Sequence, residues 1–61
     1  MQIQIIGGLA NGQFVDELEM KNPNYEKRYL EVVGCSQKVF YVDKNLNDEV
    51  ALKLILINEC T

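Results

Sequence analysis

The sequence predicts a small α+β domain in which two antiparallel β-hairpins form a small sheet and one C-terminal helix packs on it. Three observations carry this prediction. Turn-forming residues divide the first two thirds of the chain into short segments rich in strand-forming residues. Residues 45–49, NLNDE, are typical of a helix start. The 61 residues suffice for one domain, expected to span 1–61, and are too few for two.

The first strand is expected at the start of the chain. Residues 1–6, MQIQII, alternate between polar and apolar side chains, as half-buried strands do, so Ile3 and Ile5 should face the core. The segment 7–12, GGLANG, then breaks the strand. Its Asn-Gly step is a strong tight-turn signal, because both residues tolerate positive φ.

The second strand is expected over residues 13–20 and completes the first hairpin. Phe14, Leu18 and Met20 should share its core-facing side, with Asp16 an awkward member of that set. The sequence NPN at 22–24 is the clearest breaker in the chain and separates the first hairpin from the second.

The second hairpin is predicted from two further segments. Residues 26–34 form its first strand, with Leu30 and Val32 on one face, and GCSQ at 34–37 forms the turn. Residues 38–43, KVFYVD, form its second strand and are rich in strand-forming residues. Both faces of that strand are apolar, so it should be central or covered on two sides.

The C-terminal helix is predicted from its first turn. Asn47 is a favoured N-cap, and Asp48 and Glu49 complement the positive end of the helix dipole. Leu46 could pack on Ala51 as a hydrophobic staple, and the helix should run to about residue 59. Alternating apolar residues over 50–56 also fit a fifth strand, but the acidic start and the length favour a helix.

This helix would be apolar nearly all round, and it therefore needs burial on two sides. The broad face expected to cover the sheet comprises Val50, Ala51, Leu54, Ile55 and Ile57. Leu52 and Leu56 fall on the opposite side, one turn apart. We expect these two leucines to meet a second copy of the chain or another protein. The alternative is that a curled sheet or the terminal residues shield them.

A candidate ligand loop comprises Gly7, Gly8, Asn11 and Gly12. The glycines have the G-x-x-x-x-G spacing of a phosphate loop. A true phosphate loop continues with Lys and Ser or Thr, whereas this chain has Gln13 and Phe14, so a nucleoside triphosphatase is disfavoured. A glycine-lined backbone nest for an anion stays open. The simpler interpretation is a loop whose glycines permit unusual backbone angles.

The sequence argues against catalysis, metal and cofactors. It contains no histidine to activate Cys35 or Ser36 as a nucleophile. Cys35 and Cys60 lack the further ligands of a metal site. Adjacent strand residues such as Asp16 and Glu17 point to opposite faces and cannot converge as an acid–base pair. We therefore expect no enzyme activity, no metal and no cofactor.

Charge and cysteine usage bound the partners and the location. The net charge of −3 disfavours nucleic acid, because phosphate binding needs a positive surface. The longest apolar run, LILI at 54–57, is far too short for a membrane span. We also expect no signal peptide, because no basic n-region precedes an apolar stretch. Two cysteines far apart are expected to be free thiols, which fits a reducing cytoplasm. So short a domain is also expected to be a homo-oligomer.

Two stretches resemble small phage- and prophage-encoded proteins. Residues 5–15, IIGGLANGQFV, are similar to their strand, Gly-Gly pair and Gly-Gln step into a second strand. The segments 39–42 and 46–51 are similar to their aromatic strand and acidic helix start. The chain departs at Leu9-Ala10, where that pattern often has Pro and an acidic residue. The resemblance implies an accessory role in the interaction between phage and host, and it supplies no functional residue.

The expected function is that of a non-enzymatic small cytoplasmic interaction protein that binds a host protein. The alternative is a small-molecule binder that holds an anion or nucleotide in the glycine-rich loop at a subunit interface. A third hypothesis is an acidic mimic that occupies a nucleic-acid-binding surface, although a charge of −3 is small for that.

Overall fold

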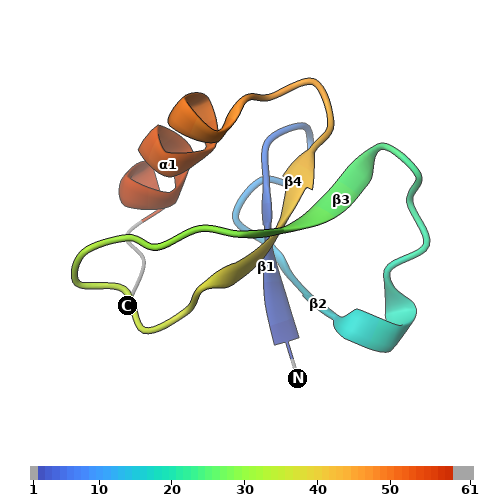
Figure 1. Cartoon of the computed structure of the whole chain (residues 1–61). Coiled ribbons are helices and arrows are strands. Elements are labelled where there is room, and N and C mark those ends of the chain that lie inside the picture. Colours follow the sequence, from blue (N-terminus) through green and yellow to red (C-terminus); the bar gives the residue numbers. More distant parts are fainter. Residues whose placement is uncertain (1, 59–61) are drawn as a thin grey trace.

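The protein folds as a four-stranded mixed sheet with one C-terminal helix, as the computed structural model of residues 2–58 shows (Figure 1). The predicted α+β class is confirmed. The elements in chain order are β1 (Gln2–Ile6), β2 (Phe14–Asp16), the 3-10 helix η1 (Glu17–Glu19), β3 (Tyr25–Tyr29), β4 (Val39–Asp43) and α1 (Asp48–Ile57).

The strand order is β2-β1-β4-β3, so the two hairpins lie side by side. β1 pairs with β2 and β3 pairs with β4, both antiparallel, as predicted. The hairpins meet through a parallel pairing of β1 and β4, in which Gln4 lies opposite Phe40. This pairing places β4 at the centre, which explains why both of its faces are apolar.

Helix α1 covers one face of the sheet. The buried side chains between them are those of Ile6, Leu30, Phe40, Val42, Ala51 and Ile55. Asn47 caps the helix as predicted, because its side-chain oxygen accepts from the backbone N–H of Val50 at 2.9 Å. Leu46 packs against the same cluster, as a staple would. The alternative of a fifth strand over 50–56 is wrong.

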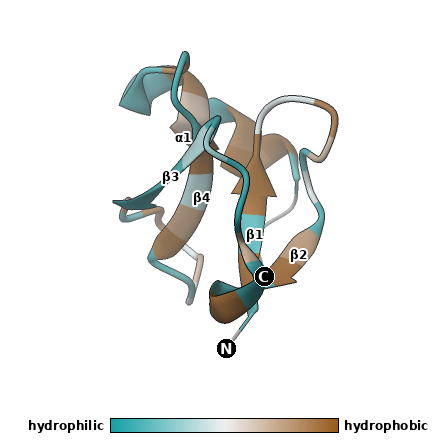
Figure 2. Cartoon of the chain, turned by 90° about the vertical axis from the view of Figure 1, so that its right-hand side faces the viewer, coloured by the Kyte–Doolittle hydropathy of each residue, from teal (hydrophilic) through white to brown (hydrophobic). Residues whose placement is uncertain are grey.

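The other face of the sheet is covered without a regular helix. Its buried residues are Ile3, Ile5 and Tyr41. The side chains packed against them are those of Ala10, Val15, Met20, Tyr25 and Val39, of which Met20 comes from the connection between β2 and β3. Figure 2 shows the two central strands as mainly hydrophobic and the edge strand β3 as hydrophilic.

The predicted second strand over 13–20 is wrong beyond Asp16. The Asp16 side chain accepts from the backbone N–H of Leu18 and starts a 3-10 turn instead. The register places Val15 opposite Ile3, so Val15 faces the core, while Phe14 is 51% exposed and Leu18 is 88% exposed. Of the three expected core residues, Met20 alone packs inside.

The third strand begins and ends earlier than predicted. It runs from Tyr25 to Tyr29 instead of over 26–34. Leu30 is buried and Val32 packs beside it, as expected from their alternation. The connection to β4 closes with a hydrogen bond from the Leu30 N–H to the Lys38 carbonyl at 2.8 Å.

Candidate functional site

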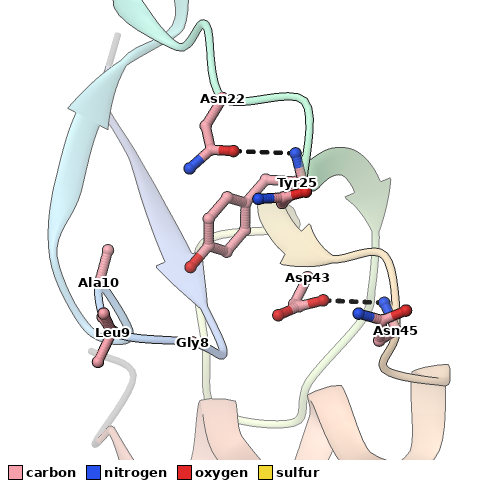
Figure 3. Close-up of a pocket in the computed structure, with 8 residues that line it drawn as sticks. Gly8, Leu9, Ala10, Asn22, Tyr25, Asp43 and Asn45 are labelled. Carbon is pink, nitrogen blue, oxygen red and sulfur yellow. Dashed lines mark hydrogen bonds between the residues drawn. The ribbon is translucent and has the colours of Figure 1, made fainter.

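A pocket of about 420 Å³ lies where the neighbouring parallel strands β1 and β4 both end (Figure 3). Three segments far apart in the sequence form its walls: the loop after β1, the loop before β3 and the loop after β4. The lining residues are Gly8, Leu9, Ala10, Asn22, Asn24, Tyr25, Asp43 and Asn45. Three loops therefore converge at one end of the sheet.

Glycine is required at both positions 7 and 8 of the first wall, because other side chains pack closely against their backbone. Both have positive φ, +93° at Gly7 and +69° at Gly8. A Cβ on Gly7 would lie 2.6 Å from the Leu46 side chain, and one on Gly8 would collide with the Tyr25 hydroxyl. Packing thus explains the Gly-Gly step without any ligand.

Tyr25 ties the second wall to the first. Its hydroxyl donates to the Gly7 carbonyl at 2.8 Å. The Lys44 N–H donates to the Asn24 carbonyl at 2.9 Å and ties the second wall to the third. Because each wall is bonded to the next, the pocket is held open by the fold itself.

Two short side-chain turns shape the remaining walls. The Asn22 side chain accepts from the Asn24 N–H, and the Asp43 side chain accepts from the Asn45 N–H, each at 2.9 Å. The other Asp43 oxygen is directed away from Asn45, toward the Gly8 side (Figure 3). Among residues 2–58, the salt bridges found leave Asp43 without a cationic partner.

The four residues of the candidate ligand loop have two different roles in the structure. Gly8 lines the pocket and Gly7 supports it. Asn11 instead accepts from the Gly7 N–H at 2.8 Å, and it exchanges two side-chain hydrogen bonds with Asn58 at the end of α1. Gly12 lies beside Asn58 as well. Asn11 and Gly12 therefore join the loop to the helix.

Two features disfavour an anion in this loop. The Gly7 N–H is already occupied by Asn11, and the Asp43 carboxylate faces the same space. The candidate ligand loop did not include Tyr25, Asp43 or the three asparagines that line the pocket. The N-x-N and D-x-N spacings were the available signal, because Asn and Asp two residues before a backbone N–H form such turns.

The outer side of α1 is defined by the residues that face away from the sheet: Glu49, Val50, Lys53, Leu56 and Ile57. The expected core face is wrong at Val50 and Ile57, which are 38% and 71% exposed. The helix turns Ala51 and Ile55 most directly inward, so residues at the edges of the expected face lie outside.

The two leucines expected at an interface differ in exposure. Leu56 is 62% exposed, as an interface residue of the free chain should be. Leu52 is half-buried and packs against the core of its own chain. Of the predicted pair, Leu56 is thus the better placed to meet a partner.

Two ion pairs join β3 to other elements of the fold. Arg28 bonds to Glu26 and to Asp48 at the start of α1, and its guanidinium also donates to the Leu46 carbonyl at 2.7 Å. Lys27 lies 2.7 Å from Glu17. A hydrogen bond with Glu17, helped by the charge of that carboxylate, raises the pKa of Lys27 above its ordinary value of 10.5.

The expectation of two free thiols is wrong at Cys35, which is disulfide-bonded. Cys60 lies outside the described residues. Within residues 2–58 no helix is long and apolar enough to cross a membrane. The same part of the chain holds no cluster of three or more His, Cys, Asp or Glu that could bind a metal ion.

The chain matches no model of a known protein family, no curated protein and no solved structure. The resemblance to phage and prophage proteins therefore stays a prediction.

Proposed function

We propose that this chain is a non-enzymatic interaction protein that associates with a second copy of itself through the outer side of α1. The observation that carries the proposal is the exposure of Leu56 and Ile57, at 62% and 71%, on a helix whose inner residues Ala51 and Ile55 are fully buried. The helix is firmly seated on its own sheet and still presents large apolar side chains to water.

Such a surface differs from the scattered apolar residues found on most proteins. Val50, Leu56 and Ile57 lie within two turns of one rigid element, whereas Leu9, Leu18 and Val33 sit singly in connections. Grouped apolar side chains on a rigid element are typical of contact surfaces.

A second copy is the partner that the surface suits. A two-fold contact sets the same surface against itself, so its charges have to be self-complementary. The outer side of α1 carries one acid, Glu49, and one base, Lys53, 3.9 Å apart within the helix. Association also suits a domain of 61 residues, whose core leaves a thin stability margin.

The structural contacts made by the carboxylates support the proposal that the protein is not an enzyme. Asp16 starts a turn, Glu17 pairs with Lys27, and Asp48 pairs with Arg28. General acid–base catalysis needs two carboxyl groups that converge on one cleft, and Asp43 is the one carboxylate in the pocket lining.

The proposal also includes a further partner and a location in the cell. The resemblance to phage and prophage proteins favours a host protein as a further partner of the assembled form. A cytoplasmic location stays a proposal, and the disulfide at Cys35 weighs against it, because disulfides are rare in reducing compartments.

The test is the mass of the untagged protein in solution, measured by native mass spectrometry and light scattering. We expect the wild type to have twice the chain mass and the double variant Leu56→Lys/Ile57→Lys to have the mass of one chain. The matched control is Val33→Lys, which changes an exposed apolar residue away from the helix and should stay dimeric. Circular dichroism verifies that each variant is folded.

A wild type that is monomeric at high micromolar concentration would overturn the proposal. So would a double variant that keeps the mass of a dimer. If the wild-type helix surface binds one larger host protein as a single chain, the occupant is that protein and the second-copy proposal fails.

A further inference from the structure

We propose that the pocket at the ends of β1 and β4 binds a small organic cation with N–H donors, a primary ammonium or a guanidinium group, between Asp43 and Tyr25. The pocket is separate from the outer side of α1, so this binding goes beyond the proposed self-association.

The position of the pocket follows from the sheet topology. Neighbouring parallel strands send their following loops out from the same end of a sheet, and in open α/β sheets ligands bind in the crevice at such ends. Here the loops after Ile6 and Asp43 leave together, and the segment that enters β3 at Tyr25 closes the third side.

The pocket has the size and the rigidity of a binding site. Its volume of about 420 Å³ falls in the range of small-molecule pockets, which begins near 300 Å³. Bonds from Tyr25 to Gly7 and from Lys44 to Asn24 join the three walls in the free protein. Walls that are already fixed lower the ordering cost of binding.

The charge of the pocket selects a cation. Asp43 is the one acidic residue of the lining, and no basic residue belongs to it. One Asp43 oxygen is held by the Asn45 N–H, while a carbon placed on Gly8 would lie 3.6 Å from the other. That second oxygen therefore faces the pocket. A half-buried carboxylate without a counter-ion attracts a cation more strongly than one in bulk water.

The remaining side chains favour a cation that carries N–H groups. The ring of Tyr25 projects toward Gly8 between Asn22 and Asp43, with its hydroxyl fixed on Gly7 (Figure 3). Cations bind to the faces of such rings. The side-chain oxygens of Asn22, Asn24 and Asn45 accept hydrogen bonds, and an amide oxygen can accept two. Ammonium and guanidinium groups satisfy all of these partners.

The test is a titration of the isotope-labelled full chain with butylammonium, followed by amide NMR at constant ionic strength. We expect saturable shifts at Gly8, Asn24 and Asn45. Tetramethylammonium has the same charge and no N–H, and butyrate has the opposite charge, so both should shift these signals less and without saturation. Equal responses to butylammonium and butyrate would overturn the proposal, as would an absence of saturation with butylammonium and methylguanidinium.

The variant Asp43→Asn keeps an oxygen for the Asn45 N–H and removes the charge. Loss of a charged hydrogen bond should raise Kd about tenfold or more. The matched control Glu31→Gln removes the same charge from an exposed residue beyond the end of β3 that lies away from the pocket, and it should leave Kd unchanged. If the two variants raised Kd equally, the binding would depend on the overall charge of the protein and not on Asp43, and the proposed site would be wrong.

A second variant keeps the test decisive if Asp43→Asn disturbs the loop. Asn24→Ala removes one pocket amide and touches none of the side-chain hydrogen bonds described above, and it should also raise Kd. A lysine-containing peptide titrated in parallel distinguishes the source of the cation. Tighter binding of the peptide than of butylammonium would identify a partner's side chain, and the reverse would identify a free amine; both support the cation site.

Discussion

The two faces of the sheet are both buried, but they are covered in different ways. On one face, a capped helix brings Ala51 and Ile55 onto the sheet at 0% exposure. On the other, Met20 of the irregular connection between β2 and β3 packs on the cluster of Ile3 and Ile5, together with Ala10 of the loop after β1. Two tyrosines secure that side through their hydroxyls, with Tyr41 donating to the Glu17 carbonyl at 3.3 Å and Tyr25 to the Gly7 carbonyl.

The two kinds of cover differ in how they satisfy their backbone hydrogen-bonding groups. A helix satisfies its own backbone groups, so it needs only an apolar side to seal a core. An irregular connection has to find partners for its backbone, and the polar groups it brings to the sheet also create polar surroundings. The pocket lies on the irregular side for this reason, whereas the apolar contact surface lies on the helix.

The largest expected effect on stability comes from truncating a buried isoleucine on either face of the sheet. Ile55→Ala should lower the free energy of unfolding by about 2–5 kcal/mol. Ile3→Ala should cost less within that range, because an irregular cover can move into the cavity and a capped helix cannot. A domain of this length has a stability of only about 3–9 kcal/mol, so Ile55→Ala brings it close to unfolding.

Urea unfolding measures both changes. Leu18→Ala is the control, because Leu18 is 88% exposed and its removal should change stability by less than about 0.5 kcal/mol. A larger loss at Ile3 than at Ile55 would contradict the idea that the irregular cover adapts more easily.

The same contrast explains what could be predicted from the sequence. The helix was recoverable because Asn47, Asp48 and Glu49 form a local start signal, and both hairpins follow from local turns. The 3-10 turn at Asp16 was missed because a single side-chain hydrogen bond to Leu18 outweighs the strand pattern there.

The pocket was only half predictable. Its glycine loop stands out in the sequence, but the parallel pairing of β1 and β4 is a contact between distant segments that no local pattern encodes. That pairing is what brings Asp43 beside Gly8. Tyr25 reaches the same loop from a third segment, so its role could not be inferred from its neighbours in the chain.

An intermediate effect is expected where the irregular cover meets the glycine loop. Gly8→Ala forces a side chain into positive φ and onto the Tyr25 hydroxyl, and should cost about 1–3 kcal/mol. Tyr25→Phe should cost about 0.5–1.5 kcal/mol through the lost hydrogen bond to Gly7. The double variant should lose less than the sum, because the phenylalanine leaves room for the new methyl group.

Thermal unfolding of all four proteins gives the coupling energy directly. Additive losses would show that the collision at Tyr25 is absent and that the cost of Gly8→Ala is backbone strain alone. Gly34→Ala is a useful control, since Gly34 also has positive φ and a Cβ there meets nothing within 4 Å.

The smallest effect is expected at the ion pair that joins the irregular cover to β3. Glu17 raises the pKa of Lys27 above 10.5, so the folded state holds this proton more tightly than the unfolded state does. The pair therefore stabilises the fold fully below the unfolded pKa, and its contribution is lost as pH rises through the folded pKa.

We expect the melting temperature of Lys27→Gln to lie slightly below that of the wild type from pH 6 to about pH 9, and the two to converge above the ordinary lysine pKa of about 10.5. Comparing the two proteins at each pH removes the pH effects that they share. A difference that stays constant through pH 11.5 would show that Lys27 acts through packing instead of charge.

The parallel pairing at the centre of the sheet also sets an order of events during synthesis. Of the four strands of this sheet, β1 leaves the ribosome first, yet one of its two neighbours, β4, is made last. Until then Ile3, Ile5 and Ile6 have no more cover than the β1–β2 hairpin can give them. Pairings between distant segments are slow to form and leave apolar strands open to aggregation. Ribosome release of β4 is thus the step at which the nascent chain can first complete its sheet.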